Sequence, residues 1–312
     1  MRHTRAVSTS GILLVDKPGG ITSHDVVSRV RKLAGTRKVG HAGTLDPLAT
    51  GLLILGLDAS TRLLTYLVGL DKEYLATIRL GQATTTDDSQ GEPVGEPVDA
   101  TGIGRDAIEE AIRPLTGVIR QVPSSVSAIK VDGKRSYDRV RAGEEFTLAA
   151  REVSVGTFEV LEVRPAELDV RVECSSGTYI RALARDLGAA LGVGAHLTAL
   201  RRTRIGPFRV AEAAQLDDRL VSTLRDPASI ARQLFDTVVL TDLERVELQQ
   251  GKRPHLQNLA ENLADSSGPI AAIDQNGDLT GLVSTAAGVA RVLVNFPTEQ
   301  VGQQDEATGV VS

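Results

Sequence analysis

Short apolar and alternating segments, separated by glycine- and proline-containing turns, recur through the first 210 residues and constrain the fold most strongly. Such runs predict β-strands. The clearest are GILLVDK at 11–17, LLILGL at 52–57, KEYLATIRLG at 72–81, REVSVGTFEVLEVR at 151–164 and AELDVRVECSSG at 166–177. Two segments with helical spacing accompany them, one beginning with Ser23 as the predicted N-cap and one at 178–192. This part of the chain is therefore predicted to combine strands with helices.

The sequence changes character after about residue 225, where shorter runs take over. A chain of 312 residues is long enough for two domains. The segment AAIDQNGDLTGLV at 271–283 places an Asn-Gly pair between two alternating runs, which predicts a hairpin. We predict one domain over 1–228, a small β-rich domain over 229–298 and a polar tail over 299–312.

The composition excludes several classes of protein. A single cysteine, Cys174, allows no internal disulfide and no cysteine-rich metal site, and the five histidines are scattered, so no metal is predicted. The N-terminus has no apolar signal region, and no apolar run approaches the ~18–20 residues that span a bilayer. We therefore expect a cytoplasmic protein with no membrane partner.

The charge is unevenly distributed along the chain. Residues 1–210 carry a net charge of +3 and residues 211–312 carry −8, which gives the total of −5. The basic residues form two clusters, which are Arg29, Arg31, Lys32, Arg37 and Lys38, and Arg201, Arg202, Arg204 and Arg209. Each cluster is either a solvated surface or a phosphate-binding patch, so the negative total does not exclude a nucleic-acid partner.

The segment GHAGTLDPLATG at 40–51 is the most unusual stretch. Its three glycines permit positive φ and close backbone approach, as a ligand-cradling loop needs. Taken alone, Asp46 before Pro47 could simply be a turn residue or a helix cap. His41 could likewise be a turn or packing residue. The spacing is not that of a phosphate-binding P-loop.

Three further positions gain meaning only in combination. Tyr74 lies in the middle of a predicted strand, where an isolated tyrosine packs against a core. Tyr179 and Arg181 lie at the start of a predicted helix, and an arginine there opposes the helix dipole, so Arg181 serves either an acidic partner or a surface ion pair. Leu200, before the second basic cluster, is by itself a core residue.

Together these segments resemble the TruB-type tRNA pseudouridine synthases. The resemblance covers at least residues 11–210 and rests on motifs that follow one another in the family's order. They are LLVDKPGGITSHDVV, GHAGTLDPLATGLL, KEYLATIRLG, VPSSVSAIKVDGKRSYD, CSSGTYIRALARDLG and GAHLTALRRTRIG. The departures are Ser176, where many relatives carry lysine, and Ser124 and Ser125, where proline is common.

The resemblance implies a role for each site residue. Asp46 is the essential carboxylate, Arg181 pairs with it, and Tyr74 lies against the target uracil. His41, Tyr179 and Leu200 line the base pocket, and Lys17 belongs to the first substrate-binding motif. The implied fold is α+β, a mixed, largely antiparallel sheet flanked by helices, with an RNA-contacting segment at about 123–150 and a C-terminal PUA-like RNA-binding domain.

The implied reaction isomerises a uridine, position 55 in the T-loop of tRNA, to pseudouridine by flipping the base and remaking its glycosidic bond. The partner is the tRNA T-stem-loop, the protein is a monomer, and neither a metal nor a nucleotide or other cofactor takes part. Whether Asp46 attacks the sugar or the base, or removes a sugar proton, stays open. Two other classes compete: an RNA-binding or RNA-folding protein, and an aspartate-based phosphotransferase, which would need further carboxylates for Mg²⁺.

Overall fold

The computed structural model describes residues 10–124, 130–131, 134–135 and 149–296. Two compact units divide the chain. Among the described residues, the larger unit lies within 13–57 and 63–224, and the smaller comprises 10–12, 58–62 and 225–296.

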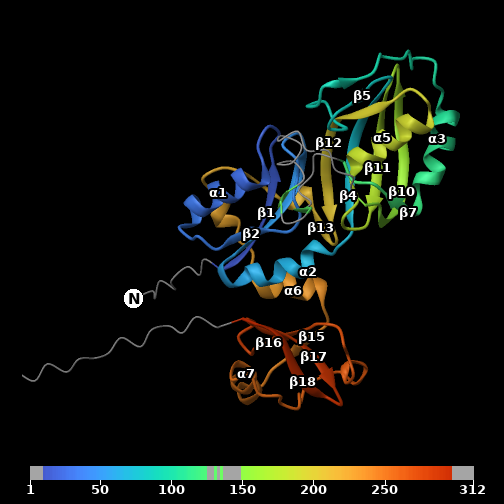
Figure 1. Cartoon of the computed structure of the whole chain (residues 1–312). Coiled ribbons are helices and arrows are strands. Elements are labelled where there is room, and N and C mark those ends of the chain that lie inside the picture. Colours follow the sequence, from blue (N-terminus) through green and yellow to red (C-terminus); the bar gives the residue numbers. More distant parts are fainter. Residues whose placement is uncertain (1–9, 125–129, 132–133, 136–148, 297–312) are drawn as a thin grey trace, which may run out of the picture. The chain divides into compact units, whose positions relative to one another are not determined.

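A mixed sheet forms the centre of the larger unit (Figure 1). Its strands are β1 (Gly11–Lys17), β2 (Val39–His41), β3 (Thr50–Leu57), β4 (Lys72–Leu80), β7 (Gly117–Gln121), β10 (Arg151–Arg164), β11 (Glu167–Cys174), β12 (Ala195–Ile205), β13 (Phe208–Arg209) and β14 (Ala214–Gln215). The order is β14-β1-β3-β12-β4-β11-β10-β7, with β2 on β3 and β13 on β12. The run from β12 to β7 is antiparallel, whereas β12 pairs with β3 in parallel, so the predicted mixed, largely antiparallel sheet is confirmed.

Helices and short turns flank this sheet. The helices are α1 (Ser23–Ala34), α2 (Leu64–Val68), α3 (Arg105–Ile112) and α5 (Ile180–Ala190), and the short strand pairs are β5 (Ala83–Thr84) with β6 (Pro93–Val94) and β8 (Lys130–Val131) with β9 (Lys134–Arg135). Short 3-10 turns of the larger unit occur at Arg113–Leu115, Val210–Glu212 and Leu220–Thr223; Glu261–Leu263 and nearly all of Asp58–Leu63 belong to the smaller unit. Over the residues described, none of the helices is long and apolar enough to cross a bilayer.

The strands β4 and β11 bury one face and leave the other polar. Alternate residues of β11 from Leu168 to Cys174 are buried, and so are alternate residues of β4 from Lys72 to Leu80. The buried side chains join one core with Leu183 and Leu187 of α5. Because strand side chains alternate between the two faces, the same strands present charged side chains on the opposite side.

The start of α1 differs from the prediction. Thr22, not Ser23, is the N-cap, and it forms a capping box with Asp25: the Thr22 hydroxyl accepts from the Asp25 amide, and the Asp25 carboxylate accepts from the Thr22 amide. Ser23 is buried and its hydroxyl bonds elsewhere. The sequence offers two adjacent capping residues, and only the Thr22 register satisfies both hydrogen bonds of the box.

The smaller unit contains a four-stranded sheet in the order β15-β16-β17-β18. Its elements are α6 (Pro227–Leu234), β15 (Thr237–Val239), α7 (Asp242–Gln249), β16 (Ile270–Ile273), β17 (Leu279–Ala286) and β18 (Val289–Asn295). Strands β16 and β17 pair in antiparallel fashion around Asn276 and Gly277, so the predicted hairpin is confirmed. Gly277 has a φ of +90°, and the Asp274 carboxylate accepts from the amides of Asn276 and Asp278.

Candidate active site

The strand β12 brings distant motifs together. In the sheet it lies between β3 and β4, and its residue Arg202 is in register with Gly51 on one side and with Tyr74 on the other. Gly51 ends the glycine-rich segment that carries Asp46. The sheet therefore places the Asp46 loop beside the strand that bears Tyr74.

The Asp46 loop connects β2 to β3 and is anchored on both sides of the carboxylate. Its neighbours Leu45 and Ala49 are buried in the core. The Ser23 hydroxyl accepts from the Leu45 amide at 2.8 Å and donates to the Leu45 carbonyl at 3.0 Å. The carbonyl of Pro47 accepts from the Gly20 amide at 2.8 Å. These anchors fix the backbone on both sides of Asp46, whose side chain lines the pocket.

An ion pair joins Asp46 to the first turn of α5. Arg181 Nε lies 3.0 Å from Asp46 Oδ2, and Arg181 Nη1 lies 3.5 Å from Asp88 Oδ2 and donates to the carbonyl of Thr86 at 2.9 Å. The Arg181 side chain is only 6% exposed, whereas that of Asp46 is 37% exposed. The pair predicted between Arg181 and Asp46 is therefore present, and Asp88 adds a second acidic partner that offsets the cost of a cation at a helix N-terminus.

Opposing effects act on the Asp46 carboxyl. Burial, the largest effect, raises its pKa above the ordinary value of an aspartate, and the charge of Asp88 acts in the same direction. The charges of Arg181 and Lys17 lower it again. The ionised form of the Asp46 carboxyl thus depends on the cations around it.

A pocket of about 250 Å³ opens in front of Asp46. Its lining residues are Gly43, Thr44, Leu45, Asp46, Lys72, Tyr74, Ser175, Ser176, Gly177, Thr178, Tyr179, Ile180, Arg181, Leu200 and Arg202. Tyr74 and Leu200 are each 8% exposed and supply apolar surface. Gln121 holds the backbone of Tyr179, accepting from its amide at 2.8 Å and donating to its carbonyl at 3.1 Å. A single carboxylate among apolar surfaces and cations suits a flat, uncharged ring that must be held beside an ionised group.

Known sequences match nearly the whole chain. Residues 31–180 match the N-terminal domain of the TruB family pseudouridylate synthases, and residues 181–246 match the C-terminal domain of tRNA pseudouridylate synthase B. The tRNA pseudouridine synthase B of Leifsonia xyli subsp. xyli is 56% identical over 299 residues, which are 94% of this chain and 98% of that protein. That of Arthrobacter sp. is 52% identical over 306 residues, 94% and 99% of the two chains. The chain belongs to the TruB family. It is thus a pseudouridine-forming isomerase that acts on RNA.

Solved structures agree with the fold of this synthase. A chain in the crystal structure of a Cbf5-Nop10-Gar1 complex matches with a TM-score of 0.68 at 25% identity, covering 92% of this chain and 84% of the other. A chain of an H/ACA RNP bound to a substrate RNA containing 2'-deoxyuridine matches with a TM-score of 0.68 at 23% identity, covering 94% and 86%. The α+β architecture predicted for a TruB-type synthase is confirmed.

The structure brings five of the predicted site residues to one pocket of the synthase, and they are Asp46, Tyr74, Tyr179, Arg181 and Leu200. His41 lies on β2, outside this lining, and burial lowers the pKa of its imidazole. Lys17 is fully buried, and its amine donates to the carbonyls of Ile21 and Pro18 at 2.7 and 2.9 Å. This geometry favours support of the backbone by Lys17 over the predicted contact with substrate.

Sequence reasoning missed Lys72 as a pocket residue. Its amine donates to the Val68 carbonyl at 2.7 Å, and burial lowers its pKa to about 8. The hydroxyl of Ser176 donates to the same Val68 carbonyl at 2.7 Å. The two side chains therefore supply hydrogen-bond donors to the C-terminal end of α2, beside the pocket. The signal was present, because Lys72 and Tyr74 stand two residues apart on one strand and share a face.

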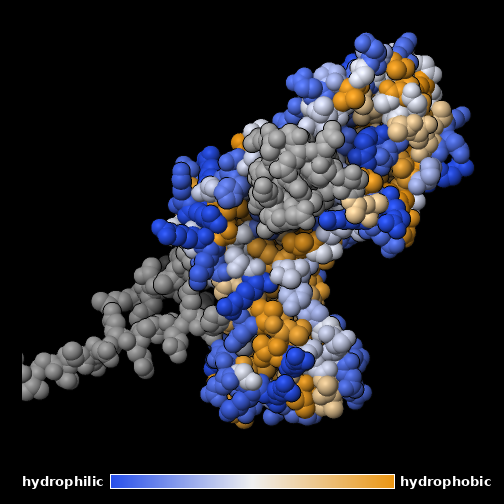
Figure 2. All heavy atoms as spheres, in the orientation of Figure 1, coloured by the Kyte–Doolittle hydropathy of each residue, from blue (hydrophilic) through white to orange (hydrophobic). Residues whose placement is uncertain are grey.

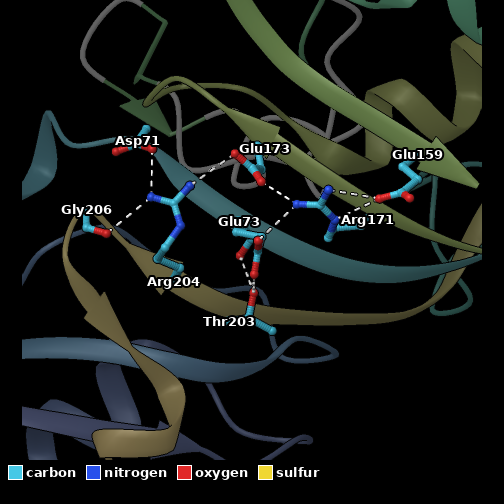
Figure 3. Close-up of polar contacts among 8 residues, drawn as sticks. All are labelled: Asp71, Glu73, Glu159, Arg171, Glu173, Thr203, Arg204 and Gly206. Carbon is cyan, nitrogen blue, oxygen red and sulfur yellow. Dashed lines mark hydrogen bonds and ion pairs between the residues drawn. The ribbon is translucent and has the colours of Figure 1, made fainter. Parts of the chain in front are cut away.

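Three of the four arginines of the second basic cluster are held by partners within the protein. Arg202 is buried within the protein. Arg201 forms a forked pair with Asp16, at 3.0 and 2.7 Å, and Arg204 pairs with Asp71 at 2.7 Å and with Glu173 at 3.4 Å. Figure 3 shows Arg204 with Asp71 and Glu173. Internal partners thus hold these three guanidinium groups, whereas Arg209 is exposed.

Proposed function

We propose that this synthase converts uridine 55 in the T-loop of tRNA to pseudouridine, with Asp46 as the catalytic carboxylate. The observation that carries the proposal is that Asp46, held by Arg181, lines one pocket together with Tyr74 and Leu200. Family membership supports the isomerisation, and relatives that are 56% and 52% identical bear the name tRNA pseudouridine synthase B.

The reaction needs a carboxylate and a closed pocket. The N1–C1′ bond of the uridine breaks, the uracil turns, and C5 joins C1′ while its proton leaves and N1 gains one, so atoms and electrons balance without a co-reactant. Ionised Asp46 either adds to the sugar or base or removes a sugar proton. Arg181 keeps the carboxylate ionised against the effect of burial. The protein walls hold the detached base beside the reactive sugar.

Tyr74 is best suited to stack on the base. Its ring lies in the pocket wall, and burial raises the pKa of its phenol above the ordinary value of ~10. The phenol therefore stays protonated at neutral pH, which favours stacking and hydrogen-bond donation over proton abstraction. A flipped base enclosed by Tyr74, Tyr179 and Leu200 would offset the few kcal/mol that unstacking costs.

The RNA would lie on the basic side of α1. Lys32 of α1 is exposed, as are Arg37 and Lys38 just after the helix, and Figure 2 shows hydrophilic side chains over α1. Such residues supply affinity through phosphate contacts. Most of the predicted RNA-contacting segment at 123–150 lies outside the described residues. We propose that the protein works as a cytoplasmic monomer without a cofactor, with a catalytic domain over 1–228 and a PUA-like RNA-binding domain over 229–298.

Tritium release tests this function. The purified protein, without added metal or nucleotide, should release tritium from a T-arm RNA that carries [5-³H]uridine at position 55 only. Asp46→Asn should bind the same RNA with a similar Kd and release none. A wild-type protein that releases no tritium would refute the proposed substrate, and substantial turnover by Asp46→Asn would refute the role of Asp46.

A further inference from the structure

Arg202 is an arginine enclosed in the protein interior. It is 1% exposed, which places it among the largest fully buried side chains of the described chain. Burial of a cation is costly unless hydrogen bonds replace its hydration. The bonds that Arg202 makes therefore indicate what it does.

The guanidinium of Arg202 binds the backbone of the Asp46 loop. Its Nε donates to the carbonyl of Leu52 at 2.7 Å, its Nη2 to that of Gly43 at 3.0 Å and its Nη1 to that of Thr44 at 3.4 Å. Gly43 and Thr44 precede Asp46, and Leu52 follows it. One planar guanidinium thus binds the backbone both before and after Asp46. A lysine, with its single ammonium group, does not reproduce this geometry.

The partners of Arg202 differ from those of its neighbours. Arg201 and Arg204 each pair with carboxylates, whereas no carboxylate of the described residues lies within ion-pair distance of Arg202. The charge of Arg202 is therefore not neutralised in an ion pair with any carboxylate of the described residues. It lies beside the phenol of Tyr74, where its charge and a side-chain hydrogen bond lower the pKa that burial raises.

The backbone of Arg202 also fits closely against the loop. A Cβ atom at Gly51 would lie 2.3 Å from the Arg202 carbonyl oxygen, and Gly51 has a φ of +99°. Glycine at this position lets the end of the loop lie on β12. On its other side, Arg202 pairs with Tyr74 of β4.

We propose that Arg202 is a positioning residue: its guanidinium ties the loop that carries Asp46 to the strands that carry Leu200 and Tyr74, and so fixes the carboxylate and the aromatic ring on the two sides of the base pocket. This role rests on the proposed function. It replaces the expectation that the Arg202 charge meets RNA phosphates.

Two variants of Arg202 and one matched control test the role. Arg202→Lys keeps a buried cation but loses the planar guanidinium, and Arg202→Met removes the charge. Arg171→Met removes an arginine from β11 of the same sheet, on the face away from the pocket. For each protein we would measure the single-turnover rate of tritium release, the Kd for the T-arm RNA and the melting temperature.

We expect Arg202→Lys to lower the single-turnover rate about 100-fold, because small misplacements of reacting groups have effects of that order. Its RNA Kd should stay within about twofold of wild type, and Arg171→Met should match wild type in both. Arg202→Met should lose at least as much rate. Arg202→Lys supplies the result if Arg202→Met does not fold.

Three outcomes would overturn the role of Arg202: an unchanged rate in folded Arg202→Lys, a weakened Kd with the rate retained, or a rate loss that equals the unfolded fraction. The first shows that the planar guanidinium is unnecessary, the second that Arg202 contacts RNA, and the third that it only stabilises the fold. A wild-type protein without turnover would instead refute the proposed function, and with it this role.

Discussion

The two faces of the sheet around β4, β11 and β12 hold their arginines in different ways. On the outer face, Arg171 lies among Glu73, Glu159 and Glu173, and Arg204 binds Asp71 and Glu173 (Figure 3). On the pocket face, Arg202 and Lys72 donate to backbone carbonyls instead.

This difference gives the two faces different roles, because the outer face contributes to stability and the pocket face to the chemistry. Partly exposed ion pairs contribute ~0–1 kcal/mol each, so any one arginine of the outer face is dispensable. On the pocket face the cations are buried, their hydrogen bonds fix backbone segments, and Asp46 is the single carboxylate among the lining residues. The cations there set the position and the charge of that one group.

Loss of Arg181 should produce the largest effect. Arg181→Met removes the cation that lowers the pKa of Asp46 and leaves Asp88 beside it. Losing a preorganised charge partner of this kind reduces rates ~10²–10³-fold. Single-turnover kinetics should show this loss with RNA binding retained, and a loss under tenfold would mean that the two faces do not differ as described.

The acid limb of the pH–rate profile should reflect the raised pKa of Asp46. Activity needs the ionised carboxylate, so the rate should fall as the pH drops through a pKa above that of an ordinary aspartate. Asp88→Asn removes a charge that raises this pKa, so its limb should move to lower pH. Single-turnover rates across the acid range measure the limb of wild type and that of Asp88→Asn. Identical limbs would contradict the effect of the Asp88 charge on the pKa of Asp46.

Lys72 should make the free energy of unfolding depend on pH in the alkaline range. Burial lowers its pKa from 10.5 to about 8, so the unfolded chain binds more protons than the folded one between these values. Stability contributed by this group therefore rises from pH 8 to pH 10.5. Urea unfolding should show a steeper rise for wild type than for Lys72→Met, and equal slopes would place the Lys72 amine in a solvated site.

The smallest effect is expected on the outer face. Arg171→Met should lower the free energy of unfolding by ~1 kcal/mol or less, because its partners are exposed enough for water to replace the guanidinium. Urea unfolding measures this, with Arg204→Met as a second outer-face variant. A change above 3 kcal/mol would show that the outer network, too, is essential to the fold.

Sequence patterns predicted the elements whose side chains alternate cleanly. The strands β4, β10 and β11 and the hairpin at Asn276 are of this kind. No alternation predicts β12, because its pairing with β4 shifts register between Leu197 and Ala199 and again after Arg202, and because the buried Arg202 occupies a position where a hydrophobic residue would be expected. Burial of a charged side chain depends on carbonyls supplied by a loop 150 residues away, which no local pattern contains.

The site, too, was predictable only in part, because some of its residues act through tertiary contacts. Asp46, Tyr74 and Arg181 were named as site residues through the family resemblance, and the structure brings all three to one pocket. The supporting residues Ser23 and Asp88 act through Leu45 and Arg181, so their places follow from tertiary contacts and not from spacing. The contact of Lys17 with substrate stays a prediction, and its buried amine donates to backbone carbonyls.

Mapping of pseudouridine at single-nucleotide resolution in an unmodified tRNA transcript tests the central claim most directly. The wild-type protein should convert uridine 55 alone, and Asp46→Asn should convert none while it still binds the transcript. Conversion at another position would contradict the proposed target, and conversion by Asp46→Asn would contradict the assignment of the chemistry to the carboxylate that Arg181 holds.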